Sequence, residues 1–263
     1  MKYVLVTGAC GGMGKSAVKA LLAKGYTVFA LDRKAEAEQE RVIPIQADVT
    51  DAESMKCALE KVRSVTEKFY AIVHFAGVYM LDSLVEMDEV SFERIFKVNL
   101  FGAFLVNKTF MPLLTRGSRI LITTSELAPL DPLPFTGVYA VSKSALDKYA
   151  YSLRMELQLL GIHVSVLRVG AVDTDMIGAS TSALDRFCKG TRLYSCNAER
   201  FKRIVDGVEA RRISTERLAG KAVGILEANT PKFAYSINRN PLLLMLGILP
   251  KRAQFFAIKQ ILK

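Results

Sequence analysis

Short apolar runs alternate with amphipathic segments along most of the chain. The apolar runs are rich in β-branched and aromatic residues, which is typical of strands buried in a parallel sheet, and they cover 2–7, 26–31, 42–47, 71–75, 120–122, 161–168 and 232–237. Apolar side chains at helical spacing predict helices over 15–24, 51–68, 91–114 and 215–227, and from residue 138 onward. This alternation predicts one doubly wound α/β domain over residues 1–240, with a mostly parallel sheet and helices on both faces.

A glycine-rich turn follows the first predicted strand and opens the first predicted helix. It contains Gly8, Gly12 and Gly14, with Cys10 and Met13 between them. Glycines let the backbone approach a pyrophosphate closely, and the helix N-terminus supplies N–H groups and a favourable dipole. The turn lies inside a β-α-β unit, which favours a dinucleotide site over the alternative of a tight turn without a ligand.

The end of the second predicted strand bears on the choice of dinucleotide. Asp32 ends this strand, where a carboxylate can accept hydrogen bonds from the adenosine ribose and repel a 2′-phosphate. Arg33, the next residue, favours the opposite choice. Because Gly12 is preceded by Gly11 and not by a basic residue, we weigh Asp32 more heavily and expect NAD rather than NADP.

A second motif whose residues could take part in catalysis lies between residues 121 and 148. Tyr139 and Lys143 are four residues apart, so a helix places them on one face. A nearby ammonium lowers the pKa of a phenol, and Ser125 on the preceding strand end could hold a substrate oxygen beside it. The pattern predicts a proton-transfer site for an alcohol or a carbonyl, although an amphipathic helix with a surface lysine would look the same.

Together these motifs resemble the short-chain dehydrogenase/reductase family. The glycines have the family's longer Thr-Gly-x-x-x-Gly-x-Gly spacing, and the Tyr-x-x-x-Lys pair follows the strand that ends at Ser125. Asn99 and Gly102 match the family's Asn-x-x-Gly in place and order. The resemblance covers about residues 2–176 and implies a Rossmann-type fold and an oxidoreductase activity.

The resemblance implies a catalytic role for four residues. Tyr139 would be the general acid/base, Lys143 would lower its pKa and hold the ribose, and Ser125 would orient the substrate. Asn99 would hold a water that links the lysine to solvent protons. The gap between Ser125 and Tyr139 is longer than the commonest family spacing, so Thr124 is the alternative serine-equivalent.

Further positions match the family's cofactor contacts. Besides the glycine motif, Asp32 and Arg33, these are Asp48 and Val49 beside the adenine, Ala76 and Gly77 at the nicotinamide ribose, and Val172 and Thr174 over the nicotinamide. The chain departs from the family where His74 and Phe75 replace two asparagines. The bracing of the central strands that an asparagine provides in the family must therefore come from elsewhere.

Residues after 176 shape the substrate pocket in this family. We expect a lid of loop and helix over about 177–213, with substrate contacts from Met176, from Phe187 and from Glu126, which directly follows Ser125. Leu184, Leu193 and Tyr194 are further candidates for pocket lining. Packing of the lid on the domain or on another subunit is the alternative for these apolar side chains.

Positive charge is concentrated in the last third of the chain. The net charge is +10, and residues 189–263 hold 15 Lys/Arg against 5 Asp/Glu, whereas residues 1–188 hold 21 of each. Residues 241–263 form an apolar and basic tail that is typical of an interfacial helix too short to span a membrane. It also resembles the tails of retinol- and hydroxysteroid-type members of the family. Docking of the tail on the core or on a partner subunit is the alternative.

Composition argues against several other classes of protein. Four cysteines without zinc spacing and only two histidines give no expectation of a metal site or of a Ser-His-Asp triad. A signal peptide and a membrane-spanning apolar run are absent, so we expect a cytoplasmic protein with peripheral membrane contact at most. No nucleic-acid-binding module is recognisable, and aromatic residues are not interleaved with the basic ones.

The sequence therefore predicts an NAD(H)-dependent oxidoreductase that interconverts an alcohol and a carbonyl. The apolar lid and basic tail favour a lipophilic substrate, such as a steroid, a bile acid, a retinoid or an acyl lipid. The resemblance implies a homodimer or homotetramer. Two alternatives stay open, a catalytically inactive dinucleotide-binding regulator and a membrane-surface or nucleic-acid-binding protein, and the complete tetrad argues against the first.

Overall fold

Seven parallel strands form one sheet in the computed structural model, which describes residues 1–34, 37–209 and 211–263, with the backbone alone described for 175–180 and 208–209. The strands are β1 (Tyr3–Thr7), β2 (Thr27–Asp32), β3 (Val42–Gln46), β4 (Phe69–His74), β5 (Leu114–Ser125), β6 (His163–Val169) and β7 (Ala234–Ile237). They lie in the order β3-β2-β1-β4-β5-β6-β7, and every neighbouring pair is parallel. The strand order therefore reverses direction beside β1, which confirms the predicted doubly wound fold.

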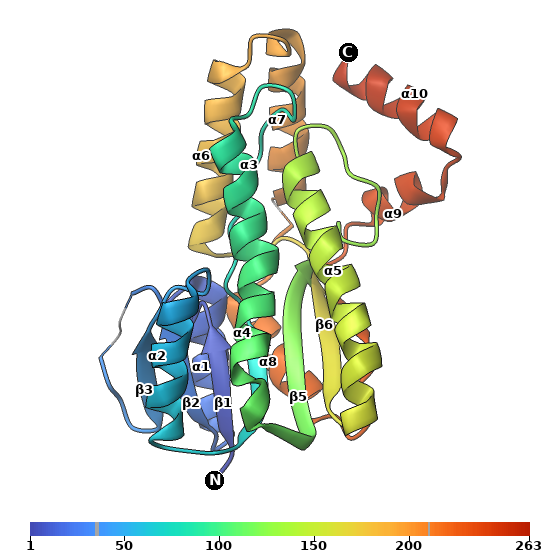
Figure 1. Cartoon of the computed structure of the whole chain (residues 1–263). Helices are drawn as coiled ribbons and strands as arrows, with labels where there is room; N and C mark the ends of the chain where they lie inside the picture. The colour runs from blue at the N-terminus through green and yellow to red at the C-terminus, as the bar shows by residue number, and fades with distance from the viewer. Residues whose placement is uncertain (35–36, 210) are drawn as a thin grey trace.

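Helices cover both faces of the sheet (Figure 1). One face packs against α2 (Ala52–Arg63), α4 (Gly102–Phe110) and α5 (Gly137–Leu157), and the other packs against α1 (Gly12–Ala23) and α8 (Thr215–Glu227). Successive strand residues serve opposite faces, since Leu5 joins the first cluster while Val4 and Val6 join the second. Burial on both faces explains why the strands read as nearly continuous apolar runs.

The single helix predicted over 91–114 is interrupted and ends earlier. The chain forms α3 (Glu89–Phe96), a π-helical turn (Lys97–Phe101), α4, and a 3-10 turn (Met111–Leu113) that leads directly into β5. Asn99 lies in the π-helical turn, a type of irregularity that often occurs at functional sites. Pro112 provides no N–H for a continuing helix, which explains the early end.

A buried polar network takes the place of the asparagine that braces the central strands in the resembled family. His74 at the end of β4 is 4% exposed, and its Nε2 donates to Oδ1 of Asn107 at 2.9 Å. The Nδ2 of Asn107 donates to the hydroxyl of Tyr149 at 3.1 Å. The network ties β4 to α4 and α5, and burial lowers the pKa of His74 from 6.5 to about 4.

Two long helices stand beyond the C-terminal ends of the strands (Figure 1). They are α6 (Asp175–Gly190) and α7 (Ser195–Glu209), in the region where a lid of loop and helix was expected. Phe187 from α6, Phe201 from α7 and Phe135 from the loop before α5 form the centre of a small separate core. The cluster therefore packs the lid helices against the loop before α5.

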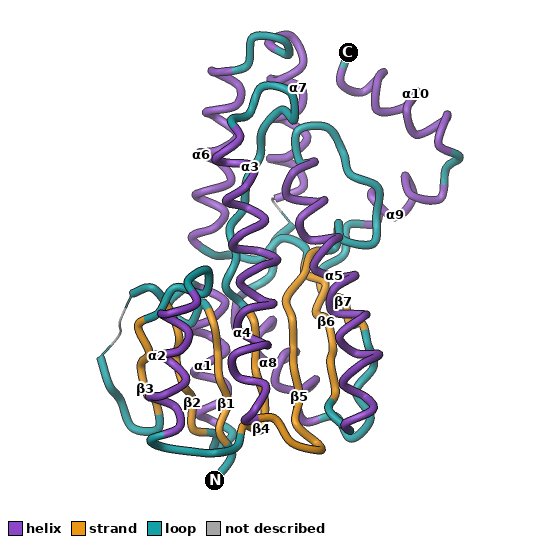
Figure 2. The backbone as a smooth tube through the Cα atoms, in the orientation of Figure 1, coloured by secondary structure: helices purple, strands orange, loops and turns teal. Residues whose placement is uncertain are grey.

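The tail consists of α9 (Pro241–Ile248) and α10 (Lys251–Leu262), which extend away from the sheet (Figure 2). Lys251 forms an ion pair with Asp131 in the loop before α5. The Nδ2 of Asn197 in α7 donates to the carbonyl oxygen of Leu262 at 2.7 Å. The tail thus contacts both the loop and the lid. Within the described ranges, no helix combines the length and the apolar character needed to cross a bilayer.

We expect His74 to make the folded chain less stable as the pH falls. Its pKa is about 4 in the folded chain and ordinarily 6.5, so the unfolded chain binds the proton more readily and stability is lost as the pH falls through this window. The full effect is about 3 kcal/mol. His74→Gln cannot titrate but keeps a donor for Asn107, and it should flatten the pH dependence of urea unfolding.

The control for this experiment is His163→Gln, which removes the partly buried histidine of β6. It should leave most of the pH dependence in place. An unchanged pH slope in His74→Gln would show that the acid sensitivity originates elsewhere in the chain.

Candidate active site

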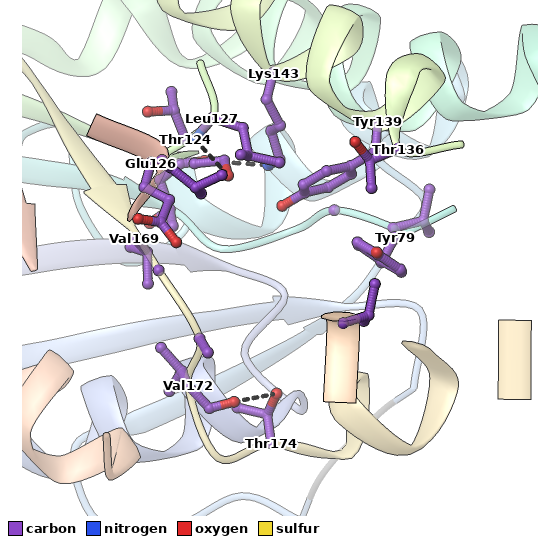
Figure 3. Close-up of a pocket in the computed structure, with 18 of the residues that line it drawn as sticks. Tyr79, Thr124, Glu126, Leu127, Thr136, Tyr139, Lys143, Val169, Val172 and Thr174 are labelled. Atoms are coloured by element: carbon purple, nitrogen blue, oxygen red, sulfur yellow. Dashed lines mark hydrogen bonds between the residues drawn. The ribbon is translucent and has the colours of Figure 1, made fainter. Parts of the chain in front are cut away.

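A cavity of about 250 Å³ opens between the C-terminal edge of the sheet and the lid (Figure 3). Its walls come from the ends of β4, β5 and β6, the start of α5, the helix α7 and the first turn of α9. Most of the lining is apolar, and the polar side chains Ser125, Glu126, Thr136, Tyr139 and Lys143 project from the strand end and from α5. The cavity can therefore hold a largely apolar ligand with its polar group near α5.

The glycine-rich turn after β1 has the geometry of a phosphate-binding loop. Gly8 has a φ of 68°, and a Cβ at this position would lie 2.6 Å from the backbone nitrogen of Ala76. A Cβ at Gly14 would lie 2.1 Å from the carbonyl oxygen of Gly8, so α1 can start this close to the strand only with glycine. Gly11 is the N-cap of α1 and no side chain caps the helix. The uncapped first turn fits the pyrophosphate of a dinucleotide.

Asp32 lies beside this turn, at the end of β2. Its two carboxylate oxygens accept hydrogen bonds from the backbone nitrogens of Cys10, at 3.0 Å, and Lys34, at 3.2 Å. The Sγ of Cys10 donates to the carbonyl oxygen of Lys34 at 3.1 Å. These bonds fix the carboxylate at the rim of the glycine turn, where a contact with an adenosine ribose was predicted.

Asp48 and Val49 follow β3. The backbone nitrogen and the hydroxyl of Thr50 both donate to Oδ1 of Asp48 at 2.8 Å. Burial alone would raise the pKa of Asp48, but these hydrogen bonds and the nearby Arg33 bring it below its ordinary value. A Cβ at Gly102 would lie 2.8 Å from Cγ2 of Val49, so the glycine of the Asn-x-x-Gly motif lets α4 approach this loop.

The loop after β4 borders the predicted catalytic residues. The backbone nitrogen of Ala76 donates to the hydroxyl of Thr7 at 3.3 Å. A Cβ at Gly77 would lie 3.2 Å from Oδ1 of Asn99 and 3.4 Å from Nζ of Lys143. Glycine at this position leaves the surroundings of the lysine open, as a site for the nicotinamide ribose requires.

The loop after β6 lies against the glycine turn from the other side. A Cβ at Gly12 would lie 3.1 Å from the methyl group of Thr174. The hydroxyl of Thr174 donates to the carbonyl oxygen of Val172 at 3.5 Å (Figure 3). The predicted cofactor residues of both loops and of the turn therefore line one continuous region.

Ser125, Tyr139 and Lys143 come together at the cavity. Ser125 ends β5, and the other two residues lie in the first turns of α5, from which they point into the cavity (Figure 3). Ser125 and Tyr139 both line the cavity, and the Oγ of Ser125 accepts from the backbone nitrogen of Leu127 at 3.2 Å. The Nζ of Lys143 donates to the carbonyl oxygen of Thr123 at 3.2 Å and lies 5.9 Å from the centre of the Tyr139 ring.

Burial has the largest effect on the pKa values of these groups. It raises the pKa of Tyr139 above 10.0, Tyr79 adds to the rise, and the polar side chain of Ser125 opposes it. Burial also lowers the pKa of Lys143 from 10.5 to about 8. The direction for Tyr139 is opposite to the one expected from the sequence, because the ammonium lies against Thr123 and both groups are removed from water.

Asn99 fixes the loop after β4 in place. Its Oδ1 accepts from the backbone nitrogen of Val78 at 2.8 Å, and its Nδ2 donates to the carbonyl oxygen of Val78 at 3.0 Å. The Nδ2 also donates to the hydroxyl of Ser142 at 3.1 Å. Asn99 thus connects the loop to α5 one residue before Lys143, and its water-binding role stays a prediction.

A buried ion pair anchors α5 to the sheet. Asp147, 5% exposed, accepts from Nε of Arg168 at 3.0 Å and from its NH2 group at 2.8 Å. Thr124 donates to the same carboxylate at 3.2 Å. Because the hydroxyl of Thr124 is used here, the geometry favours Ser125 over Thr124 as the predicted serine-equivalent.

The predicted substrate residues have different outcomes. Glu126 lines the cavity, and its Oε2 accepts from the backbone nitrogen of Asn240 at 2.6 Å. Phe187 is 4% exposed and packs in the lid core against Phe135, outside the set of cavity-lining residues. The side chain of Met176 lies outside the described part of the chain. The other lid candidates, Leu184, Leu193 and Tyr194, do not line the cavity either.

Several lining residues were not found from the sequence. Tyr79 packs on Tyr139 with ring centroids 4.8 Å apart. Its position just after the Ala-Gly step could have identified it as a lining residue. Phe201 comes from the inner face of α7, which was not recognised as a separate helix. Leu243 comes from the tail, and no local pattern indicates that α9 returns to the cavity.

A model of the short chain dehydrogenase family matches residues 2–185. Estradiol 17-beta-dehydrogenase 2 of Mus musculus is 35% identical over 193 residues, which cover 68% of this chain and 50% of the relative. The match thus spans about half the length of that relative. NADPH-dependent 3-dehydrocapnine reductase of Ornithobacterium rhinotracheale is 28% identical over 251 residues, covering 90% of this chain and 88% of the relative.

A solved structure has the same fold. The short chain dehydrogenase of Burkholderia cenocepacia J2315 in complex with NADP superposes with a TM-score of 0.75 at 22% identity, covering 100% of each chain. At this identity the likeness concerns the fold, and the chemistry must be argued from the residues of this chain.

Proposed function

Because this chain belongs to the short-chain dehydrogenase family, we propose that it is an oxidoreductase that interconverts an alcohol and a carbonyl with NAD(H). The observation that carries this proposal is the convergence of Ser125, Tyr139 and the buried Lys143 on one largely apolar cavity. A bound nicotinamide would accept or donate the hydride, and the glycine turn and the two loops would hold it.

The residues of the chain supply the proton and the orientation. The hydroxyl of Tyr139 gives its proton to the substrate oxygen during reduction and takes it back during oxidation. Ser125 holds the same oxygen, and Asn99 positions the loop that borders Lys143. Since burial raises the pKa of Tyr139, the neutral phenol is the form that is stable at neutral pH, which suits its role as an acid.

We propose NAD as the preferred dinucleotide because the Asp32 carboxylate is fixed at the rim of the glycine turn. A 2′-phosphate placed there would meet this negative charge. Arg33 and Lys34 are the exposed basic residues next to it and favour NADP. Asp32 is held by two backbone donors, whereas Arg33 is on the outside, so the carboxylate should dominate.

We propose a lipophilic substrate, such as a steroid, a bile acid, a retinoid or an acyl lipid. The support is the apolar lining that Leu127, Leu133, Phe201, Ile204 and Leu243 give to the cavity. Two of these residues come from α7 and one from α9, so the lid and the tail both shape the pocket.

We propose that the chain forms a homodimer or homotetramer through α3, α4 and α5, which lie side by side on one face (Figure 1). Exposed apolar side chains gather on these helices, among them Phe92, Phe104, Tyr151 and Met155. An exposed apolar patch of this kind is typical of a surface that is buried in an assembly.

We also propose that the tail contacts anionic membrane surfaces. Leu242, Met245 and Ile248 of α9 and Phe255 and Phe256 of α10 are exposed. The basic residues Lys251, Arg252, Lys259 and Lys263 lie in the same segment. Apolar side chains next to lysine and arginine are what an interfacial helix uses to bind lipid.

The first test of the activity is Tyr139→Phe. Turnover measured at 340 nm should fall by roughly a hundredfold to ten-thousandfold because the proton donor is lost, while NADH fluorescence titration should give an affinity within about twofold of the native one. In the native chain, alcohol oxidation should increase toward alkaline pH because the phenol must first ionise against a raised pKa.

Tyr149→Phe is the matched control, since it alters another partly buried tyrosine of α5, one that does not line the cavity, and should keep turnover. Retained activity in Tyr139→Phe would contradict the acid/base role. NADH binding without turnover of any alcohol or ketone by the native chain would favour the regulator alternative.

Asp32→Ser should change the choice of dinucleotide. Without the carboxylate, the ratio of kcat/KM with NADH to that with NADPH should fall by roughly tenfold to a hundredfold, since a negative neighbour no longer repels the 2′-phosphate. Arg33→Ala should move the ratio in the opposite direction. A ratio that is insensitive to Asp32→Ser would mean that the carboxylate does not set the preference.

The double variant Phe255→Ser, Phe256→Ser should weaken membrane binding. The native chain should sediment with phosphatidylserine vesicles and should be released by salt, because the contact is partly electrostatic. The double variant should stay in the supernatant, whereas Val65→Ser, which alters an exposed apolar residue just after α2, should bind as the native chain does. Equal sedimentation of all three proteins would exclude the tail as the contact.

A further inference from the structure

Glu126 is an acidic side chain in an otherwise apolar part of the cavity. It directly follows Ser125 at the end of β5 and is 9% exposed. Among the described residues that line the cavity, it is the one carboxylate. Figure 3 shows its carboxylate on the side of the cavity opposite α5, facing the space into which the Tyr139 hydroxyl points.

One oxygen of this carboxylate, Oε2, has a hydrogen-bond partner in the protein. It accepts from the backbone nitrogen of Asn240 at 2.6 Å, and the Glu126 backbone nitrogen donates to the carbonyl oxygen of Val169 at 2.9 Å. The orientation of the side chain is therefore fixed from both ends. Oε1 lies over Gly170, where a Cβ would be 3.1 Å away, and Gly170 itself lines the cavity.

The other oxygen, Oε1, has no hydrogen-bond donor among the described residues. Within the described ranges, Oε1 accepts no hydrogen bond, although it carries part of a buried negative charge. Burial raises the pKa of Glu126, and the hydrogen bond from Asn240 and the charge of exposed Arg239 oppose this rise. The nearest cation in the cavity wall, Lys143, donates instead to Thr123. Oε1 faces the cavity and is free to accept a hydrogen bond from a ligand there, and a bond to a charged acceptor in an apolar cavity is a strong one.

The contact with Asn240 alone does not account for a carboxylate. A neutral glutamine could accept the same hydrogen bond through its side-chain oxygen without the cost of burying a charge. What a glutamate adds is the second oxygen and the negative charge, and both face the cavity. The second oxygen and the negative charge of Glu126 are thus directed at the ligand.

We propose that Glu126 makes the cavity select substrates that carry a hydrogen-bond donor, a hydroxyl or an amino group, close to the reacting carbon. The inference rests on the proposed function, because Ser125 and Tyr139 define where the reacting carbon lies. Oε1 accepts the hydrogen bond of the donor while Oε2 stays on Asn240. A carboxylate within reach of Glu126 is repelled, so the positive charge of the last third of the chain does not extend to this pocket.

The test uses matched medium-chain ketones whose carbon next to the carbonyl carries hydrogen, hydroxyl, an amino group or a carboxymethyl group. The native chain with NADH should prefer the hydroxyl or amino ketone over the plain ketone by roughly tenfold to a hundredfold in kcat/KM, mainly through KM. The carboxymethyl ketone should be the poorest substrate.

Glu126→Gln keeps an acceptor for Asn240 and removes the charge. It should lower the preference for the amino ketone by roughly tenfold and relieve the discrimination against the carboxymethyl ketone. A hydroxyl preference should fall less, because a glutamine still accepts from a hydroxyl, and this difference separates the two donor groups. Glu227→Gln removes an exposed carboxylate of α8 that does not line the cavity, and it should keep the native preferences.

Calorimetric binding of the corresponding amino alcohol and plain alcohol to the native chain with NAD⁺ separates this inference from the proposed function. Tighter binding of the amino alcohol that depends on Glu126 supports the inference even if no ketone is reduced. Turnover without any preference for a donor overturns the inference and leaves the oxidoreductase proposal standing. Absence of both binding and turnover overturns it as well.

Discussion

The ion pair between Asp147 and Arg168 holds the part of the molecule on which the site depends. Asp147 follows Lys143 by one helical turn and Tyr139 by two, so a shift of the carboxylate would move both side chains in the cavity. The two hydrogen bonds from Arg168 lock α5 to β6, and Thr124 adds a contact to β5. A bidentate pair of this kind fixes direction as well as distance, which is what aligning Tyr139 with Ser125 requires.

Removal from water governs the chemistry of the cavity once α5 is in place. The pKa of Tyr139 is raised and that of Lys143 is lowered, and both shifts favour the neutral side chain. The raised pKa of Glu126 also favours its neutral form. The ammonium of Lys143 donates to the carbonyl oxygen of Thr123, Glu126 accepts from the backbone of Asn240, and the ring of Tyr139 packs on Tyr79. The site combines an apolar lining suited to a lipophilic ligand with a few polar atoms whose directions are fixed.

The sequence predicted the sheet, its covering helices and the association of Ser125, Tyr139 and Lys143, because strand burial and helical spacing are local patterns. It missed the π-helical turn at Asn99, since apolar periodicity continues on both sides of it, and it could not show that Asn99 in this turn contacts Val78 in the loop after β4. It placed Phe187 at the substrate, whereas the aromatic cluster of the lid buries that ring. The pKa direction of Tyr139 was also wrong, because burial depends on the complete fold.

The hydrogen bond from the Asn240 backbone to Glu126 joins the N-cap residue of α9 to the residue after Ser125. The same helix contributes Leu243 to the cavity wall. The free energy of ligand binding in the cavity therefore depends on the conformation of the tail. Any surface or partner that displaces α9 must change the affinity for substrate. Thermodynamic reciprocity then requires the substrate to change the affinity for that surface by the same factor. The Glu126 carboxylate thereby couples the tail to the reaction in the cavity.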